Sequence, residues 1–201
     1  KTTIMAIIGN IIKGFIATTD VVRKDKDPVE EQREVLKTLL ETAKETQFGQ
    51  HYGFGSILES EDMVQHFRQK VPYFDYPKIT QEWWNRTIDG EADVTWPGTP
   101  NFFALSSGTT GKKSKRIPVT EDMIDAIKNA GIKQVLALNN FDMPAEFFEK
   151  EIMMLGSSTN LKERDGRHEG EISGISASNI PFWFRRYYKP GEEIAQIDDW
   201  D

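Results

Sequence analysis

The chain has no cysteine among its 201 residues, which excludes a disulfide framework and thiolate chemistry. It has only three histidines, His51, His66 and His168, and because they lack the spacing of metal ligands we expect no protein-held metal. An excess of positive charge is also missing. The net charge of −7 argues against a nucleic-acid partner, since such a partner requires a basic surface.

Long apolar runs are absent as well. The most apolar segment, residues 1–17, is too short to span a bilayer. Its isoleucines and Phe15 recur at the spacing of one helical face, which predicts an amphipathic helix docked on the protein rather than a targeting signal. Few cations accompany this face, so we expect no stable membrane association.

The composition is that of an ordinary globular protein, with 38% hydrophobic and 28% charged residues. A chain of this length can form one domain with a sizeable core. The alternative is that it is an incomplete piece of a larger protein. The absence of cysteine is compatible with a cytoplasmic location.

The stretch Phe102–Pro118 carries the strongest chemical signal. An apolar run, Phe102–Leu105, leads into six small residues, Ser106–Gly111, and a basic group follows at Lys112, Lys113, Lys115 and Arg116. Glycines and small hydroxyl residues let successive backbone N–H groups point into one concavity, which suits an anion. We interpret the stretch as a phosphate-binding loop between two strands. The alternative is an ordinary turn followed by solvated lysines.

Two common nucleotide motifs do not match this loop. The mononucleotide P-loop needs a glycine five residues after its first one, and this chain has Lys113 five residues after Gly108. The Gly-x-Gly-x-x-Gly dinucleotide fingerprint does not fit the loop either. A phosphate-binding loop of another kind is therefore expected.

The loop resembles a motif of a known family. Ser106-Ser107-Gly108-Thr109-Thr110-Gly111 followed by Lys115 is similar to the first ATP motif of adenylate-forming enzymes. The gap from Gly111 to Lys115 is one residue longer than in the typical CoA ligase, and it fits better the auxin-responsive Gretchen-Hagen family of acyl acid amido synthetases. The similarity runs from about residue 30 onward, through Thr46–Gly49, His51–Phe54, Val71-Pro72, Asp75-Tyr76, Trp96–Gly98 and Ser114–Thr120. One departure is Lys112, where many plant members carry a second glycine.

The resemblance implies an α/β fold, namely the N-terminal part of the large domain of an adenylate-forming enzyme, with a mixed sheet flanked by helices. It implies a helical segment at residues 1–100 that packs on the core, and an incomplete nucleotide-binding part at 101–201. The family's later motifs and its C-terminal domain would lie beyond residue 201. The implied activity is ATP-dependent joining of a carboxylic acid to an amino acid through an acyl-adenylate, with Mg²⁺, and the fragment alone is expected to be inactive.

The same resemblance assigns site residues. Lys115 is expected to be catalytic, and the phosphates are expected to be bound by Ser106, Ser107, Gly108, Thr109, Thr110 and Gly111. Lys112 and Lys113 either assist by electrostatics or are solvated. The helix after the loop is expected to face the acid, with Ile127, Gly131 and Gln134 as candidate substrate residues.

Two other functions stay open. An acyl-CoA ligase of the same superfamily would share the loop and transfer the acyl group to a thiol. A non-catalytic fragment would use the loop only to bind an anion or a nucleotide.

Capping patterns predict three helices. Asp27–Glu30 opens the first, and its inward residues are Leu36, Leu39, Leu40 and Ala43. Ser60–Asp62 opens the second, and Val71-Pro72 ends it. Thr120 caps the third, whose inner face is Ile124, Ile127, Gly131, Val135 and Leu138. A glycine inside a helix is unfavourable, so Gly131 is expected to pack closely on a neighbour, with a ligand beside it as the alternative.

Other segments are predicted from composition. Gln47–Gly55 is punctuated by glycine and is expected to be a loop, and Lys162–Glu171 is charged and is expected to be an exposed loop. Ile152–Leu155 is a continuous apolar run and predicts a buried strand. Trp83 and Trp84 are expected to be packing residues, with stacking of bases or sugars as the alternative. The aromatic residues of Phe182–Tyr188 are expected to pack in the core, with binding of single-stranded nucleic acid as the alternative.

Overall fold

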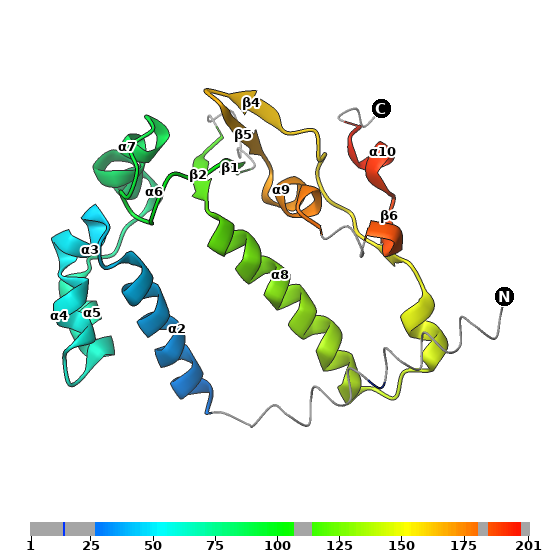
Figure 1. The fold of residues 1–201 in the computed structure, drawn as a ribbon, viewed down its shortest axis with the longest axis horizontal. Helices are drawn as coiled ribbons and strands as arrows, with labels where there is room; N and C mark the ends of the chain where they lie inside the picture. Colours follow the sequence, from blue (N-terminus) through cyan, green and yellow to red (C-terminus); the bar gives the residue numbers. More distant parts are fainter. Residues whose placement is uncertain (1–13, 15–26, 107–113, 181–184, 198–201) are drawn as a thin grey trace. The chain divides into compact units, whose positions relative to one another are not determined.

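The computed structural model describes Gly14 and residues 27–106, 114–180 and 185–197 (Figure 1). The chain divides into two compact units. The first is residues 25–101, and the second is residues 102–201 together with residues 1–24. The helix expected at residues 1–17 lies outside the described residues except for Gly14.

The first unit is built from short helices and begins with α2 (Pro28–Ala43). Asp27 caps α2 as predicted, because its side chain accepts a hydrogen bond from the Val29 N–H at 2.8 Å and Pro28 occupies the first turn. Of the residues predicted to face inward, Leu40 and Ala43 are buried, whereas Leu39 is exposed.

The core of this unit lies where α2 meets α4 (Phe54–Leu58) and α5 (Met63–Lys70), which run beside it in Figure 1. Leu40 and Ala43 pack there with Phe54 and Ile57. Asp62 caps α5 by accepting from the Gln65 N–H at 3.1 Å, and α5 ends at Val71 as predicted.

The prediction of a loop at Gln47–Gly55 is wrong. The segment forms α3 (Gln47–Tyr52) and the start of α4. Thr46 caps α3 by accepting from the Gly49 N–H at 3.1 Å, and Gly53 reverses the chain between the two helices with a φ of 68°. Glycine here serves a tight helix junction, which composition alone does not distinguish from a loop.

Three further helices complete the unit: α6 (Tyr76–Ile79), η1 (Thr80–Trp84) and α7 (Asn85–Ile88). Trp83 is buried, which confirms its predicted packing role. Its ring lies 5.0 Å from that of Phe48, and the Phe48 ring lies 4.7 Å from that of Tyr52. The Phe48–Trp83 contact is edge-to-face, a geometry that stabilises an aromatic pair beyond the area that it buries.

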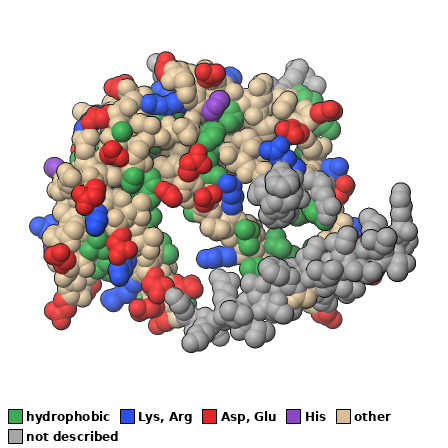
Figure 2. All heavy atoms as spheres, viewed as in Figure 1, with side chains coloured by type: hydrophobic (Ala, Val, Ile, Leu, Met, Phe, Trp, Pro, Cys, Tyr) green, Lys and Arg blue, Asp and Glu red, His purple; other side chains and the backbone are tan. Residues whose placement is uncertain are grey.

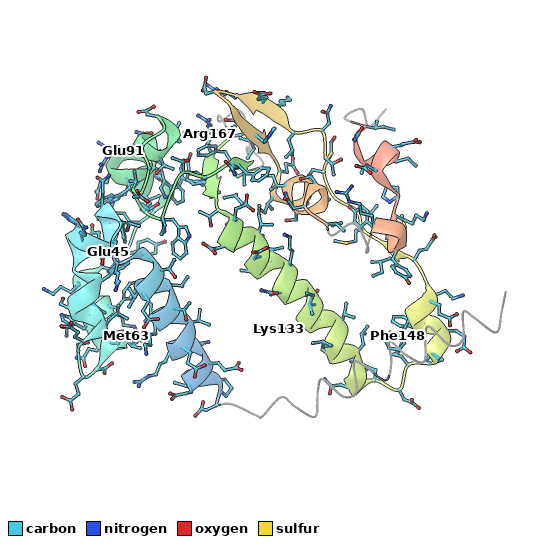
Figure 3. All side chains as sticks on the ribbon, in the orientation of Figure 1. Glu45, Met63, Glu91, Lys133, Phe148 and Arg167 are labelled. Atoms are coloured by element: carbon cyan, nitrogen blue, oxygen red, sulfur yellow. The ribbon has the colours of Figure 1, made fainter. Side chains whose placement is uncertain are left out.

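A polar network joins α3 to the chain after α7. Arg86 Nε donates to Glu91 Oε2 at 2.8 Å, and Arg86 Nη2 donates to Glu91 Oε1 at 2.6 Å. Gln47 Nε2 donates to Glu91 Oε1 at 2.7 Å, and Arg86 Nη2 also donates to Gln47 Oε1. The hydrogen bonds from Arg86 and then from Gln47 lower the pKa of Glu91 to about 2. Glu91 is labelled in Figure 3.

This network predicts a pH-dependent contribution to stability. Because the pKa of Glu91 falls from 4.5 to about 2 on folding, its stabilising effect is complete above 4.5 and is lost as the pH falls toward 2. The difference in the free energy of unfolding between the wild type and Glu91→Gln should therefore shrink on acidification through this window. Urea unfolding at a series of pH values measures it.

The control for this prediction is the same substitution made together with Arg86→Met. Without the guanidinium, replacing Glu91 should produce a much smaller pH-dependent difference. A difference between the wild type and Glu91→Gln that stays constant across the window would contradict the prediction.

The second unit contains a four-stranded mixed sheet, which confirms the predicted α/β class. Its strands are β1 (Phe102–Leu105), β2 (Arg116–Val119), β4 (Lys162–Arg164) and β5 (Arg167–Gly170), in the order β2-β1-β5-β4. β1 runs antiparallel to β2 and parallel to β5, and β4 runs antiparallel to β5. In this register Leu105 lies opposite Arg116, and Phe103 lies opposite Glu169.

The prediction of an exposed loop at Lys162–Glu171 is wrong, because β4 and β5 form a hairpin there. Asp165 and Gly166 at its tip have φ values of 52° and 72°, the positive values that a two-residue hairpin turn requires. The side chains of β4 are exposed on an edge strand, so its composition is that of a loop. On β5, however, Glu169 is buried.

The helices α8 (Glu121–Leu136) and α9 (Ile172–Ser178) flank the sheet. Thr120 caps α8 as predicted by accepting from the Met123 N–H at 3.2 Å. Ile124 of α8 and Ile175 of α9 form one buried cluster with Ala104 and Val119 of the sheet. This cluster holds the strands β1 and β2 against the helices.

The remaining elements are η2 (Ala137–Asn140), η3 (Ala145–Glu149), β3 (Ile152–Met153), η4 (Arg185–Tyr187), β6 (Tyr188–Lys189) and α10 (Glu192–Ala195). The prediction of a buried strand at Ile152–Leu155 is wrong. Only two of its residues form a strand, and all four side chains are exposed, Leu155 by 86%. Within the described residues β3 pairs only with β6, so an apolar sequence alone does not bury it.

Candidate functional site

The loop between β1 and β2 starts and ends at two residues that are hydrogen-bonded to each other. The Ser106 N–H donates to the Lys115 carbonyl oxygen at 3.1 Å, and the Lys115 N–H donates to Ser106 Oγ at 3.3 Å. These bonds continue the β1–β2 ladder, in which Leu105 pairs with Arg116. The first and last residues of the predicted phosphate loop are therefore held in place at the end of the sheet.

The structure brings together two of the predicted phosphate-site residues, Ser106 and Lys115. Ser106 is half-buried and Lys115 is exposed. An exposed ammonium group at this position is accessible to an anion bound in the loop. The other predicted loop residues, Ser107, Gly108, Thr109, Thr110 and Gly111, lie outside the described residues together with Lys112 and Lys113.

A charged pair lies on the sheet next to the end of the loop, since one of its members, Arg116, directly follows Lys115. Arg116 Nη2 forms an ion pair with Glu169 Oε1, and the two side chains are only 17% and 8% exposed. The Arg116 guanidinium carbon lies 4.9 Å from the ring centroid of Phe103, which is fully buried, and that of Arg167 lies 5.7 Å from the same centroid. Figure 3 labels Arg167 on β5. Guanidinium groups over an aromatic face are stabilised by its negative electrostatic potential.

Sequence reasoning missed this pair because it placed Glu169 in a loop. A usable signal was present in the Asp165-Gly166 dipeptide, since an Asp-Gly pair between two extended segments predicts a hairpin. With the hairpin assigned, Arg167 and Glu169 fall on one face of a strand.

The candidate acid-facing residues lie on α8. Ile127 is half-buried, and Gly131 and Gln134 are exposed. The expectation that Gly131 packs closely on a neighbour is wrong, because a Cβ added there would meet no atom within 4 Å. Ile124 is the one buried residue of α8, so the packing of this helix on the sheet is confined to its first turns. Within the described part of the chain, Gly131 and Gln134 on this side of the helix are exposed and Ile127 is half-buried.

The described residues offer little for a protein-held metal. Among them, no three His, Asp or Glu side chains come together as ligands.

Acidic and basic side chains are interspersed over the face that Figure 2 shows. No helix in the described part of the chain has both the length and the hydropathy needed to cross a membrane.

Comparison with known protein families gives a match over most of the chain. A model described as the GH3 family N-terminal domain matches residues 18–201, which is most of the chain and includes residues 25–101 of one unit and residues 102–201 of the other. A comparison with curated proteins found no match. The mixed sheet flanked by helices agrees with the N-terminal part of an adenylate-forming domain. The chain therefore belongs to the GH3 (Gretchen-Hagen) family of acyl acid amido synthetases, whose N-terminal domain it matches.

Proposed function

We propose that this chain supplies the phosphate-binding part of an ATP-dependent acyl acid amido synthetase. The observation that carries the proposal is the hairpin between β1 and β2. The loop of this hairpin contains the motif. Hydrogen bonds join the two ends of the loop, Ser106 and Lys115, where β1 ends. The family of the chain supports the same reaction class.

The proposed reaction has two steps. A carboxylate oxygen of the acid attacks the α-phosphorus of ATP, and the bond to the bridging oxygen breaks so that pyrophosphate leaves. The amine nitrogen of an amino acid then attacks the acyl carbon, AMP leaves, and the nitrogen loses a proton to give the amide. The task of the loop is to stabilise the charge that develops on the pyrophosphate, through backbone N–H groups, hydroxyl groups and the Lys115 ammonium.

ATP would enter as its magnesium complex. Mg²⁺ bound with a nucleotide takes most of its ligands from phosphate oxygens and water, and few from the protein. The described residues fit this mode, since they offer hydroxyl and ammonium groups at the ends of the loop and no assembled cluster of acidic ligands. A cytoplasmic location goes with the proposal, because ATP and amino acids are both available there.

The acid is proposed to lie along α8. Ile127 offers apolar contact, Gly131 leaves room beside the helix, and the Gln134 amide offers hydrogen bonds. The three residues are spaced by four and three positions, so they share one side of the helix.

ATP–pyrophosphate exchange on the complete gene product tests the proposed function. We expect exchange that depends on a carboxylic acid, found by assaying a panel of such acids. Exchange that needs no acid, or no exchange with any acid of a broad panel, would argue for a fragment that only binds anions. A second assay, with amino acids and CoA compared as acceptors, separates an amido synthetase from an acyl-CoA ligase.

A further inference from the structure

The Arg116–Glu169 ion pair lies close to the loop and is largely shielded from solvent. Arg116 is the residue immediately after Lys115, and it lies opposite Leu105, the last residue of β1. Glu169 lies on the other side of β1, opposite Phe103. The ion pair therefore reaches from β2 across β1 to β5, over the ring of Phe103.

An ion pair with this degree of burial contributes little net stability to the three strands, because removing both charges from water is unfavourable. A carboxylate as buried as Glu169 is unfavourable unless it is paired, and two apolar residues of similar size would often give equal or greater stability. What this ion pair adds is position, since removing either charge leaves the other largely buried and unpaired, so Arg116 is held against Glu169. The position of Arg116 matters for the loop, because Arg116 directly follows Lys115, the last residue of the loop.

We propose that Arg116 and Glu169 are positioning residues for phosphate binding. Held by Glu169, Arg116 fixes the β2 end of the loop relative to β1, and so sets where the Lys115 ammonium and the Ser106 hydroxyl lie. The hydrogen bonds between Ser106 and Lys115 transmit this position to the other end of the loop. The inference rests on the proposed function and adds two residues to it that lie outside the loop motif.

The test is steady-state ATP–pyrophosphate exchange by the complete gene product carrying Glu169→Gln or Arg116→Met. Each variant should raise the KM for MgATP about tenfold, because a small misplacement of a binding group weakens binding strongly. The KM for the acid should change little. Arg116→Lys keeps the charge and should recover part of the loss.

Lys162→Met is the matched control. Lys162 lies opposite Glu169 on the exposed edge strand β4, so this variant removes a charge next to Glu169 without touching the ion pair. Its KM for MgATP should equal that of the wild type. The melting temperature of every variant is measured alongside, because a purely structural pair would lower the melting temperature and the active fraction while leaving the KM for MgATP unchanged.

A double-mutant cycle with Lys115→Ala closes the argument. If Glu169 acts through Lys115, then Glu169→Gln should have a much smaller effect on the KM for MgATP once Lys115 has been replaced. Additive effects, or an unchanged KM in Glu169→Gln, would overturn the positioning role while leaving the proposed function in place. Absence of acid-dependent exchange in the wild type would instead remove the proposed function.

Discussion

Replacing Lys115 by alanine is expected to lower kcat/KM for acid adenylation by about 10²- to 10³-fold, the usual effect of removing one preorganised group that stabilises transition-state charge. The charge on the β- and γ-phosphates grows as pyrophosphate leaves, so the ammonium contributes more in the transition state than in the ground state. Because the same ammonium also binds the phosphates of bound ATP, the loss should appear both in kcat and in the KM for MgATP. Exchange kinetics with saturating and subsaturating MgATP separate the two parameters.

Lys113→Ala is the matched control for this prediction. Both residues are lysines of the same basic group, but only Lys115 stands at the position of the family motif, and its backbone is hydrogen-bonded to Ser106. Lys113→Ala should cost much less activity. Equal losses in the two variants would mean that the charge of the group as a whole matters and that Lys115 has no special role.

Replacing Gly49 by alanine is expected to destabilise the helical unit by about 1–3 kcal/mol, the usual range for a side chain forced into a filled site. A Cβ at Gly49 would overlap the carbonyl oxygen of Ala43 and would lie 2.9 Å from the Ala43 carbonyl carbon and from Lys44 Cα. All three atoms belong to the backbone, so no side-chain rotation relieves the contact. Chemical denaturation measures the loss.

The close approach at Gly49 has a local cause. Thr46 is buried, donates its hydroxyl to the Ala43 carbonyl oxygen at 2.7 Å, and accepts from the Gly49 N–H at 3.1 Å. One hydroxyl thereby ties the end of α2 to the start of α3. The backbone of Gly49 is drawn onto the last turn of α2, where there is no space for a side chain.

Gly55→Ala provides the control for Gly49→Ala. Gly55 lies in α4 of the same unit, and an added Cβ would meet no atom within 4 Å. Alanine is the better helix former, so this variant should be as stable as the wild type or about 0.5–1 kcal/mol more stable. Equal destabilisation by both substitutions would show that helix propensity, and not the contact with Ala43, explains the loss.

Predictions that depend on neighbours along the chain are confirmed by the structure. Asp27 and Thr120 cap their helices because a cap needs only a side-chain oxygen and an N–H group two or three residues later. The strand at Phe102–Leu105 follows from an apolar run bounded by turn residues. The family, too, was predicted from contiguous motifs.

Predictions that depend on distant partners are the wrong ones. The glycines of Gln47–Gly55 predict a loop, whereas Gly49 lies in α3 and is needed because the backbone of Ala43 approaches it. The charged composition of Lys162–Glu171 predicts an exposed loop, whereas the segment forms the β4–β5 hairpin and β5 pairs with β1. Ile152–Leu155 is apolar but exposed, because burial needs a second layer and not only an apolar sequence.

The same division applies to the candidate site. By itself the sequence determined the loop motif and the special position of Lys115, because a phosphate-binding loop is made of consecutive residues. Only the tertiary structure decided that Arg116 and Glu169 form a buried pair across β1 and that the side of α8 at Gly131 is open. The register of one strand against another brings such groups together or leaves them apart, and that register is set by segments far away in the chain.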